Sequence, residues 1–255
     1  MVSALDIPWL APIFMSPIAG SFVGVLVRRL PEDRPIAWAR SQCESCQRTL
    51  GLTDLVPIAS YLALRGRCAT CRAPIAPFHL AIELAAVAVA VWAATVSQDA
   101  AWLWTACMLG WGLLALSWID AEHMRLPDAL TLPLLAAGIA AQTMLASERF
   151  TESVLGAIVG YLGFRAIALT YRLCRGREGL GGGDAKLLSV AGAWVGWAAL
   201  PDVILLAAVF GLGLAVVMKM RGRTIDRVAI IPFGPCLALA LWIVYLYGPF
   251  LFGWR

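Results

Sequence analysis

Eight apolar runs divide the chain, and each is about long enough to cross a bilayer as a helix, which takes roughly 17–25 residues for about 30 Å of hydrocarbon. Of the 255 residues, 61% are hydrophobic and 14% are charged. An ordinary soluble enzyme could not cover that much apolar surface, and a disordered chain would not contain it. We therefore predict an all-α polytopic membrane protein with about eight transmembrane helices, at residues 8–27, 79–97, 100–119, 129–146, 153–171, 186–200, 203–219 and 231–252.

The positive charges fall on alternate connections between these runs. Of the 20 Lys and Arg residues, 17 lie in the segments 28–78, 120–128, 172–186 and 219–230. The positive-inside rule places such segments in the cytoplasm. An even number of spans then puts both termini on the opposite, periplasmic side, so the span count and the charge pattern agree.

The one long polar segment sets the predicted division of the chain. Residues 1–27 form the first transmembrane helix, which we interpret as an anchor because it lacks the basic start and small-residue cleavage site of an export signal. Residues 28–78 form a cytoplasmic four-cysteine domain. Residues 79–255 form a multi-helix membrane domain.

Two C-x2-C pairs in the polar segment are spaced like the ligands of a metal site. Cys43 and Cys46 form the first pair, and Cys68 and Cys71 the second. Two such pairs make a tetrahedral four-thiolate site, and disulfides are rare in the cytosol, so we favour a structural zinc over redox-active cysteines or disulfides. With four protein ligands no position stays open for water, and no catalytic metal is expected. The lone cysteines, Cys107, Cys174 and Cys236, are predicted to be buried small apolar residues.

Two aspartates are predicted to lie at one face of the membrane. Asp120 ends the third apolar run and Asp184 precedes the sixth, so two helices separate them and both return to the cytoplasmic boundary. Two carboxylates at one site share a proton, which suits them to activate water. The glycines Gly181, Gly182 and Gly183 would let Asp184 sit at an irregular junction. Alternatively, Asp120 is a helix-end acid facing headgroups and Asp184 is a helix N-cap.

Other charged residues have weaker interpretations. Asp128 follows Pro127 directly before an apolar run, as an N-cap does. Glu122 and His123 either tune the aspartates or are solvated. Arg165 lies inside a predicted span, where a partner acid or an aqueous cavity would offset its insertion cost. The sequence assigns it no role.

Six segments, taken in order, resemble the bacterial type IV prepilin peptidases. They are GSFVGVLVRRLP, the two cysteine pairs, DLVPIASYLALRGRC, IDAEHMRLPD, GREGLGGGDAKLL and IPFGPCLALA, and together they cover nearly the whole chain. Three positions depart from the family pattern. Gly24 stands where the family usually has Asn, Glu122 where it often has a second Asp, and Gly182 where it often has an aromatic residue.

The resemblance implies a bifunctional membrane enzyme of the G-x-G-D aspartyl protease type. By motif match, the catalytic pair is Asp120 and Asp184, supported by the Gly181–Gly183 loop. The family cleaves the leader of prepilins or pseudopilins at the cytoplasmic face of the bacterial inner membrane, and many members then methylate the new N-terminus with S-adenosyl-L-methionine. Since no Rossmann-type glycine motif follows a strand, the methyltransferase assignment rests on this resemblance alone, with Glu83 as candidate residue.

Two alternatives remain open at this stage. One is a leader peptidase without methyltransferase activity. The other is a non-enzymatic, zinc-containing membrane transporter or scaffold in which Asp120 and Asp184 carry protons or ions. The order of the motifs favours the bifunctional enzyme, whose partners are prepilin-like substrates and the lipid bilayer, with no nucleic acid.

Overall fold

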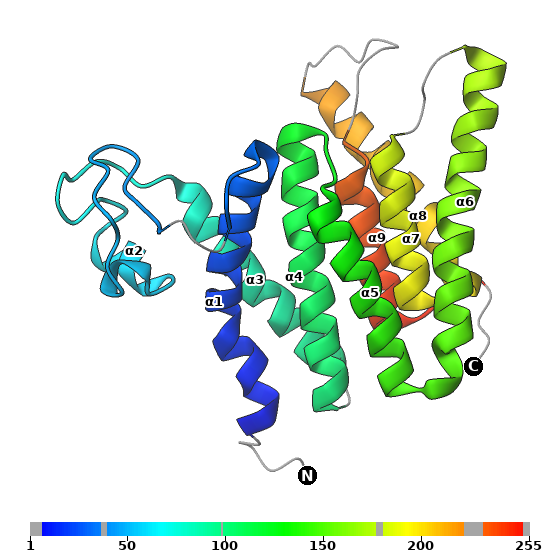
Figure 1. Cartoon of the computed structure of the whole chain (residues 1–255), viewed down its shortest axis with the longest axis horizontal. Coiled ribbons are helices and arrows are strands. Elements are labelled where there is room, and N and C mark those ends of the chain that lie inside the picture. The colour runs from blue at the N-terminus through cyan, green and yellow to red at the C-terminus, as the bar shows by residue number, and fades with distance from the viewer. Residues whose placement is uncertain (1–6, 37–39, 98, 177–180, 222–231, 252–255) are drawn as a thin grey trace. The chain divides into compact units, whose positions relative to one another are not determined.

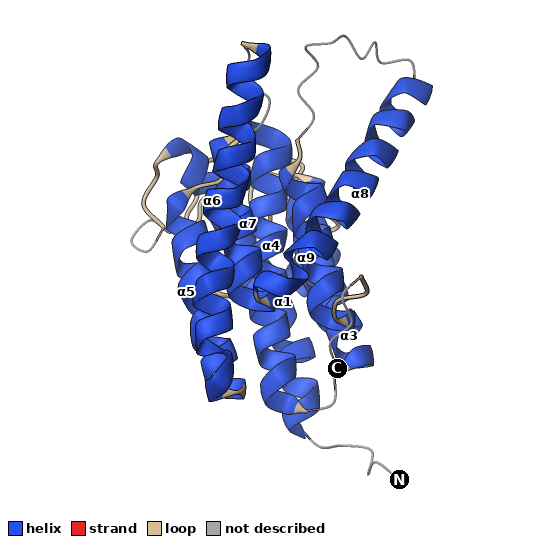
Figure 2. Cartoon of the chain, turned by 90° about the vertical axis from the view of Figure 1, so that its right-hand side faces the viewer, coloured by secondary structure: helices blue, strands red, loops and turns tan. Residues whose placement is uncertain are grey.

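The computed structural model describes residues 7–36, 40–97, 99–176, 181–221 and 232–251. These residues form helices, turns and loops, and within them no strand is present, only two isolated β-bridges (Figure 2). The predicted all-α class is therefore confirmed. The helices are α1 (Ile7–Arg29), α2 (Ala59–Ala63), α3 (Pro77–Val96), α4 (Ala100–His123), α5 (Asp128–Leu145), α6 (Phe150–Arg175), α7 (Gly182–Val195), α8 (Leu200–Met220) and α9 (Gly234–Tyr247) (Figure 1).

Each of the eight predicted apolar runs coincides with one helix other than the short α2. Six of these helices, together with their flanking turns, are long and apolar enough to cross a membrane. The other two, α7 and α9, have 14 residues each. At 1.5 Å per residue they extend for about 21 Å, which is shorter than the hydrocarbon core.

The limits of the two short helices differ from the predicted runs. The run predicted at 186–200 is a helix only to Val195, because Gly196 takes a φ of 78° and a 3₁₀ turn, Trp197–Ala199, follows. The run predicted at 231–252 is helical over Gly234–Tyr247 and ends at Gly248, whose φ is 82°. Residues 231 and 252 lie outside the described residues. A positive φ ends a helix and is adopted most readily by glycine.

The chain divides into two compact units, residues 1–115 and 116–255, and the boundary falls within α4. In the first unit α1 packs against α3. A Cβ on Gly20 would lie 2.7 Å from the Cα of Glu83, so a glycine is required where these two helices cross. The divisions predicted at residues 28 and 79 remain predictions.

In the second unit α7 is packed against α5, α6 and α9. The α6–α7 contact is close, since a Cβ on Gly192 would lie 2.0 Å from the carbonyl oxygen of Gly156. Hydrogen bonds join α7 to α5. The Trp194 Nε1 donates to the Leu134 carbonyl at 2.9 Å, and the Gln142 Nε2 donates to the Trp194 carbonyl at 2.8 Å. The enclosed α7 is therefore a rigid support for its own first turn, which carries Asp184.

Candidate functional site

Asp120 lies in the last turn of α4, and its side chain is only 6% exposed. Its Oδ2 accepts a hydrogen bond from the backbone N–H of Gly234, the first residue of α9, at 2.9 Å. A Cβ on Gly234 would lie 2.5 Å from the same Oδ2, so only a glycine lets the backbone approach this closely. The start of α9 thus fixes one oxygen of Asp120.

Asp184 is the third residue of α7 and is partly buried. Gly182, Gly183 and Asp184 form the first turn of the helix, so the irregular junction predicted for Asp184 is wrong. The N-cap alternative is also wrong, since Gly181 occupies that position with an extended backbone. A Cβ on Gly183 would lie 3.1 Å from the Leu126 side chain, and one on Gly181 would lie 3.2 Å from the Asp184 Oδ2, whereas Gly182 has open space around it.

The two aspartates influence each other within the second unit. Asp184 lies outside the six candidate membrane spans. Burial, followed by the negative charge of Asp120, raises the pKa of Asp184 to about 6, although a hydrogen bond from the Gly181 backbone acts in the opposite direction. A negative charge within electrostatic range disfavours ionisation of a carboxyl group, so Asp120 adds to the effect of burial at Asp184. The pair can therefore hold one proton and one negative charge at about pH 6.

An ion pair joins α5 to α7 beside the aspartates. The Asp128 Oδ1, in the first turn of α5, contacts the Lys186 Nζ, two residues after Asp184. The prediction that Asp128 is an N-cap is wrong, because Pro127 holds that position and no side chain caps the helix. The pair instead connects the beginnings of α5 and α7 through two residues that are 58 positions apart in sequence.

Glu122 and His123 follow Asp120 at the end of α4. The Trp118 Nε1 donates a hydrogen bond to the Glu122 Oε1 at 2.8 Å, and the His123 Nε2 lies 3.8 Å from the Glu122 Oε2. Glu122 is therefore partnered by residues of its own helix. Its proposed role in tuning the aspartates remains a prediction.

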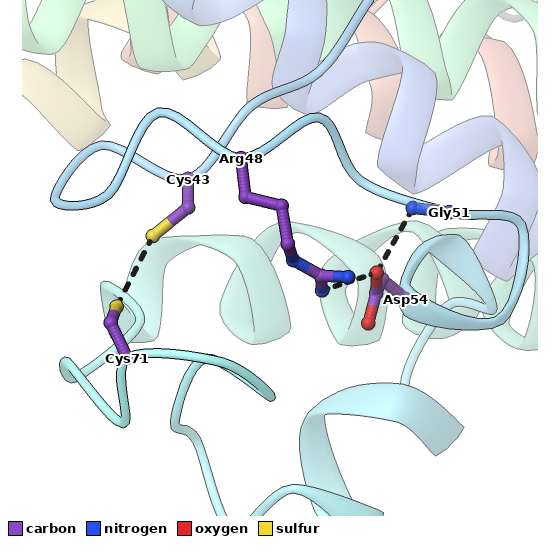
Figure 3. A network of polar contacts seen from close by, with 5 residues as sticks. All are labelled: Cys43, Arg48, Gly51, Asp54 and Cys71. Atoms are coloured by element: carbon purple, nitrogen blue, oxygen red, sulfur yellow. Dashed lines mark hydrogen bonds and ion pairs between the residues drawn. The ribbon is translucent and has the colours of Figure 1, made fainter.

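The four cysteines predicted to bind metal come together in the first unit. Their sulfur atoms all lie within 4.8 Å of one another, and the Cys43 and Cys71 sulfurs are 3.8 Å apart (Figure 3). In a tetrahedral zinc site with Zn–S bonds of about 2.3 Å, sulfurs are separated by about 3.8 Å. The cluster therefore fits a four-thiolate metal site.

The two cysteine pairs have the same backbone geometry. The Cys43 N–H donates to the Arg48 carbonyl and the Gln47 N–H to the Cys43 carbonyl, both at 2.9 Å. In the second pair, the Cys68 N–H donates to the Ala73 carbonyl at 2.9 Å and the Arg72 N–H to the Cys68 carbonyl at 3.1 Å. A β-bridge closes each turn, and the fourth residue after the first cysteine has a φ of 59° or 60°. Two copies of one knuckle thus face each other.

Backbone hydrogen bonds lower the pKa of two of these thiols and so favour the thiolate form that binds a metal cation. N–H groups of Cys71 and Thr70 lower the pKa of Cys68 to about 6, and those of Cys46 and Ser45 lower the pKa of Cys43. The Ala73 N–H acts in the same direction at Cys71, but burial and the neighbouring thiols raise the pKa of Cys71 to about 11. Four thiolates would repel one another, and a bound divalent cation removes that penalty.

A second interaction stabilises the segment after the first knuckle. The Asp54 Oδ2 accepts a hydrogen bond from the Arg48 Nη2 at 2.7 Å and one from the Gly51 N–H at 2.9 Å (Figure 3). Asp54 therefore ties the end of the knuckle to the loop that leads into α2.

Glu83, the methyltransferase candidate, is a buried carboxylate in α3. Its Oε2 accepts a hydrogen bond from the Ile58 backbone N–H at 2.7 Å, and the Ser21 side chain also bonds to it. Glu83 thus connects α1, α3 and the residue that precedes α2. Its carboxylate already has protein partners, so its role in methylation remains a prediction.

The remaining predicted positions have mixed outcomes. Cys107 and Cys236 are buried as predicted, but Cys174 is exposed, because it lies in the last turn of α6 beyond the packed part of that helix. Arg165 is exposed on α6, and no acid pairs with it among the described residues. Arg177 and most of the predicted 219–230 loop lie outside the described residues.

The sequence does not by itself identify Gly234 or Lys186 as parts of this site. A glycine before a proline marks a helix start, so the signal at Gly234 is for a fold boundary. A lysine after Asp184 is one of several cations near the membrane boundary. Only the three-dimensional contacts pair Gly234 with Asp120 and Lys186 with Asp128.

The fold and these residues define a multi-helix membrane protein with one buried and one partly buried aspartate and a four-cysteine cluster. The model of the type IV leader peptidase family matches residues 107–216, and the bacterial peptidase A24 N-terminal domain matches residues 14–97. The chain belongs to the type IV leader peptidase family, as predicted.

Curated relatives resemble the chain over most of its length. Proteins named prepilin leader peptidase/N-methyltransferase are 36% identical in Pseudomonas aeruginosa, 39% in Burkholderia pseudomallei and 34% in Aeromonas hydrophila. These matches cover 94%, 89% and 98% of this chain, and 90%, 81% and 96% of the relatives. No solved structure gives a significant match. The relatives and the six candidate spans indicate a bacterial membrane protein.

Proposed function

We propose that this chain is a membrane aspartyl endopeptidase that removes the leader peptide of type IV prepilin-like proteins and then methylates the new N-terminal amine. The membership of the family and the names of the relatives support both reactions. One observation carries the peptidase assignment. The helix ends that carry the two aspartates are closely packed, because the Asp120 Oδ2 at the end of α4 accepts the Gly234 N–H, and Gly183, next to Asp184 in the first turn of α7, packs against Leu126 of the α4–α5 connection.

The aspartate pair supplies acid–base chemistry for peptide hydrolysis. One carboxylate takes a proton from water, whose oxygen attacks the scissile carbonyl carbon. The carbon–nitrogen bond then breaks, and a proton from the pair goes to the leaving amine. Because the two groups titrate as a coupled pair, we assign the roles to the pair and not to separate residues.

The local packing supports this use of the pair. The Gly234 N–H holds one oxygen of Asp120, and the contact between Gly183 and Leu126 places the first turn of α7 against the α4–α5 connection. Positioning of this kind reduces the entropy that must be lost on the way to the transition state. The start of α9, the α4–α5 connection and the first turn of α7 therefore position the two acids at one end of the second unit.

The methylation belongs to the first unit in this proposal. S-adenosyl-L-methionine, the donor that the family resemblance implies, would supply an electrophilic methyl group. No glycine-rich nucleotide loop follows a strand among the described residues, so no donor site is assigned. We propose Glu83 as the residue of this region that the reaction needs, since it is a buried acid where α1, α3 and the residues before α2 meet.

Zinc is the metal that we propose for Cys43, Cys46, Cys68 and Cys71. Four thiolate ligands complete a tetrahedral shell, so the ion would hold the two knuckles together and take no part in the reaction. We also propose that the chain lies in the inner membrane with the aspartates at the cytoplasmic face and both termini in the periplasm. The distribution of Lys and Arg over the loops supports this orientation.

The test is incubation of the full-length protein with a prepilin and S-adenosyl-L-methionine, read by mass spectrometry of the product. We expect a leaderless, methylated pilin from the wild type, and uncleaved prepilin from Asp120→Asn and Asp184→Asn variants that still insert and bind zinc. Cleavage by either variant would remove the aspartate pair from the mechanism. A cleaved but unmethylated product from the wild type would leave the peptidase alone.

A Glu83→Ala variant separates the two reactions. We expect it to cleave prepilin and to leave the new N-terminus unmethylated. The conservative Glu83→Gln variant keeps an oxygen that can accept the Ile58 N–H, so it distinguishes the need for a charge from the need for that hydrogen bond. Normal methylation by Glu83→Ala would exclude Glu83.

A further inference from the structure

Large apolar side chains are exposed in a segment outside the candidate spans. In residues 52–62, which we call the 52–62 segment, Leu52 is 88% exposed, Val56 49% and Leu62 61%. Leu55, between them, is 41% exposed. Single exposed apolar residues are common, but four within eleven residues of a short connecting segment indicate a surface that contacts an apolar environment.

A hydrogen bond fixes the depth of this segment relative to α3. The Ile58 N–H, in the middle of the segment, donates to the Glu83 Oε2 at 2.7 Å. Glu83 is the seventh residue of α3, which begins at Pro77, so it lies about 9 Å along the helix axis from the first residue. Since α3 has 20 residues and extends for about 30 Å, its first residue must lie near the edge of the hydrocarbon.

Glu83 therefore lies about 9 Å inside the boundary between headgroups and acyl chains. Interfacial helices bury their apolar face about 5–10 Å into that boundary. The 52–62 segment contains such a short helix, α2, at Ala59–Ala63. The hydrogen bond to Glu83 brings α2 to the depth at which exposed leucines would meet lipid.

The backbone of the segment adopts an unfavourable conformation at Ile58. Ile58 has a φ of 62°, which is unfavourable for a β-branched residue. A conformation of this kind persists only where neighbouring contacts impose it. The Glu83 carboxylate, itself supported by Ser21, provides that contact. The orientation of α2 is thus built into the fold.

Positive charge follows the apolar residues. Arg65 and Arg67 lie just after α2, and both are exposed. Long arginine side chains at this place can reach phospholipid headgroups while neighbouring apolar side chains enter the acyl region. The same charges would attract an anionic surface and repel a basic peptide.

We propose that the 52–62 segment is an interfacial anchor that inserts Leu52, Val56 and Leu62 into the bilayer leaflet at which α3 begins, with Arg65 and Arg67 binding anionic phospholipid headgroups. The partner is the bilayer itself. The anchor would hold the four-cysteine cluster, which lies on both sides of this segment in the sequence, against the membrane surface.

The test places the photo-crosslinker p-benzoylphenylalanine at Leu62 in the full-length protein, in nanodiscs of phosphatidylethanolamine and phosphatidylglycerol. The control carries it at Ser45, an exposed polar position in the first knuckle. Zinc content checks that both proteins are folded. We expect lipid adducts at position 62 several-fold above those at position 45, with phosphatidylglycerol above its share of the bilayer. Replacing Arg65 and Arg67 by Gln should leave the adducts but remove that excess.

Three results would overturn the proposal. The first is an absence of lipid adducts at position 62 in folded protein. The second is an equal yield at positions 45 and 62. The third is an adduct with added prepilin that replaces the lipid adduct, which would make the 52–62 segment a substrate-binding surface. An excess of phosphatidylglycerol that survives the Arg65→Gln, Arg67→Gln double substitution would refute the role of the two arginines.

Discussion

The backbone N–H of Gly234 donates a hydrogen bond to the Oδ2 of Asp120 across 114 residues of sequence, at 2.9 Å. Because a Cβ on Gly234 would lie 2.5 Å from this oxygen, the start of α9 and the end of α4 are matched to each other at atomic distance. A backbone donor has no side-chain torsions, so it holds the carboxylate at little entropic cost. The position of the Asp120 carboxylate therefore depends on a glycine at position 234.

The Gly234→Ala substitution should displace the Asp120 carboxylate and reduce cleavage. We expect kcat/KM for a prepilin to fall by about 100-fold, equal to about 2.7 kcal/mol of transition-state stabilisation. Gly213→Ala is the matched control, because that glycine lies in α8 with nothing within 4 Å of a new Cβ. Equal rates for the two variants would show that the contact with Asp120 is not needed.

The Asp184→Asn substitution should stabilise the protein at neutral pH but not in acid. Asp184 has a pKa of about 6 in the fold against an ordinary value of 3.8, so its stabilising contribution is complete below about pH 4 and is lost as the pH rises through 6. Asn does not ionise and avoids this loss, which amounts to roughly 1–3 kcal/mol. We expect the variant to melt at a higher temperature than the wild type at pH 7.5, and at a similar temperature at pH 4.

Asp99 provides the control for the melting experiment on Asp184→Asn. Asp99 is exposed and its Oδ1 accepts the Trp102 N–H at a helix start, a role that Asn also fills. Asp99→Asn is therefore the matched control for the change from a carboxylate to an amide. For cleavage by the wild type, the same pKa predicts that activity declines as the pH rises above about 6, since the pair then loses its shared proton.

The glycines before Asp184 should differ in their tolerance of a side chain. A Cβ on Gly183 would lie 3.1 Å from Leu126, whereas Gly182 has nothing within 4 Å. We expect Gly183→Ala to reduce kcat by about 10-fold, or about 1.4 kcal/mol, through a shift of the first turn of α7. Gly182→Ala should cleave at nearly the normal rate, in a side-by-side measurement of prepilin turnover. The opposite ranking would contradict this packing.

The sequence predicts the helices and the residue types of the site better than it predicts their contacts. Apolar runs and C-x2-C spacing are local signals, so the helix positions and the cysteine cluster follow from them. The ends of α7 and α9 do not, because they depend on single glycines, Gly196 and Gly248, that adopt a positive φ. The contact of Gly234 with Asp120 joins residues far apart in the chain, and no periodicity encodes it.

The same distinction explains the error at Asp128. An acid after proline at the start of an apolar run has the local features of an N-cap. In the structure Pro127 is the N-cap residue of α5. Asp128 instead forms an ion pair with Lys186 of a different helix, α7. A tertiary ion pair of this kind replaces the local interaction, and sequence patterns report only the local one.

Replacing Cys43 and Cys46 by Ser should remove zinc from the protein. Two of four thiolates are lost, and the remaining pair cannot complete a tetrahedral site. Elemental analysis should give one zinc per chain for the wild type and almost none for the double variant, which should also express poorly. Cys174→Ser is the control, because Cys174 is exposed and outside the cluster, and it should keep one zinc per chain.

The ion pair between Asp128 and Lys186 should affect turnover more than stability. Both side chains are partly exposed, and such pairs contribute about 0–1 kcal/mol, so Lys186→Met should hardly change the melting temperature. The pair nevertheless sets the position of the first turn of α7, which carries Asp184. We expect Lys186→Met to reduce kcat several-fold with an unchanged KM, and the charge exchange Asp128→Lys, Lys186→Asp to recover part of the loss. A rise in KM with an unaffected kcat would instead mean that Lys186 contacts the substrate, because a positioning residue changes the rate of the bound complex and not the strength of binding.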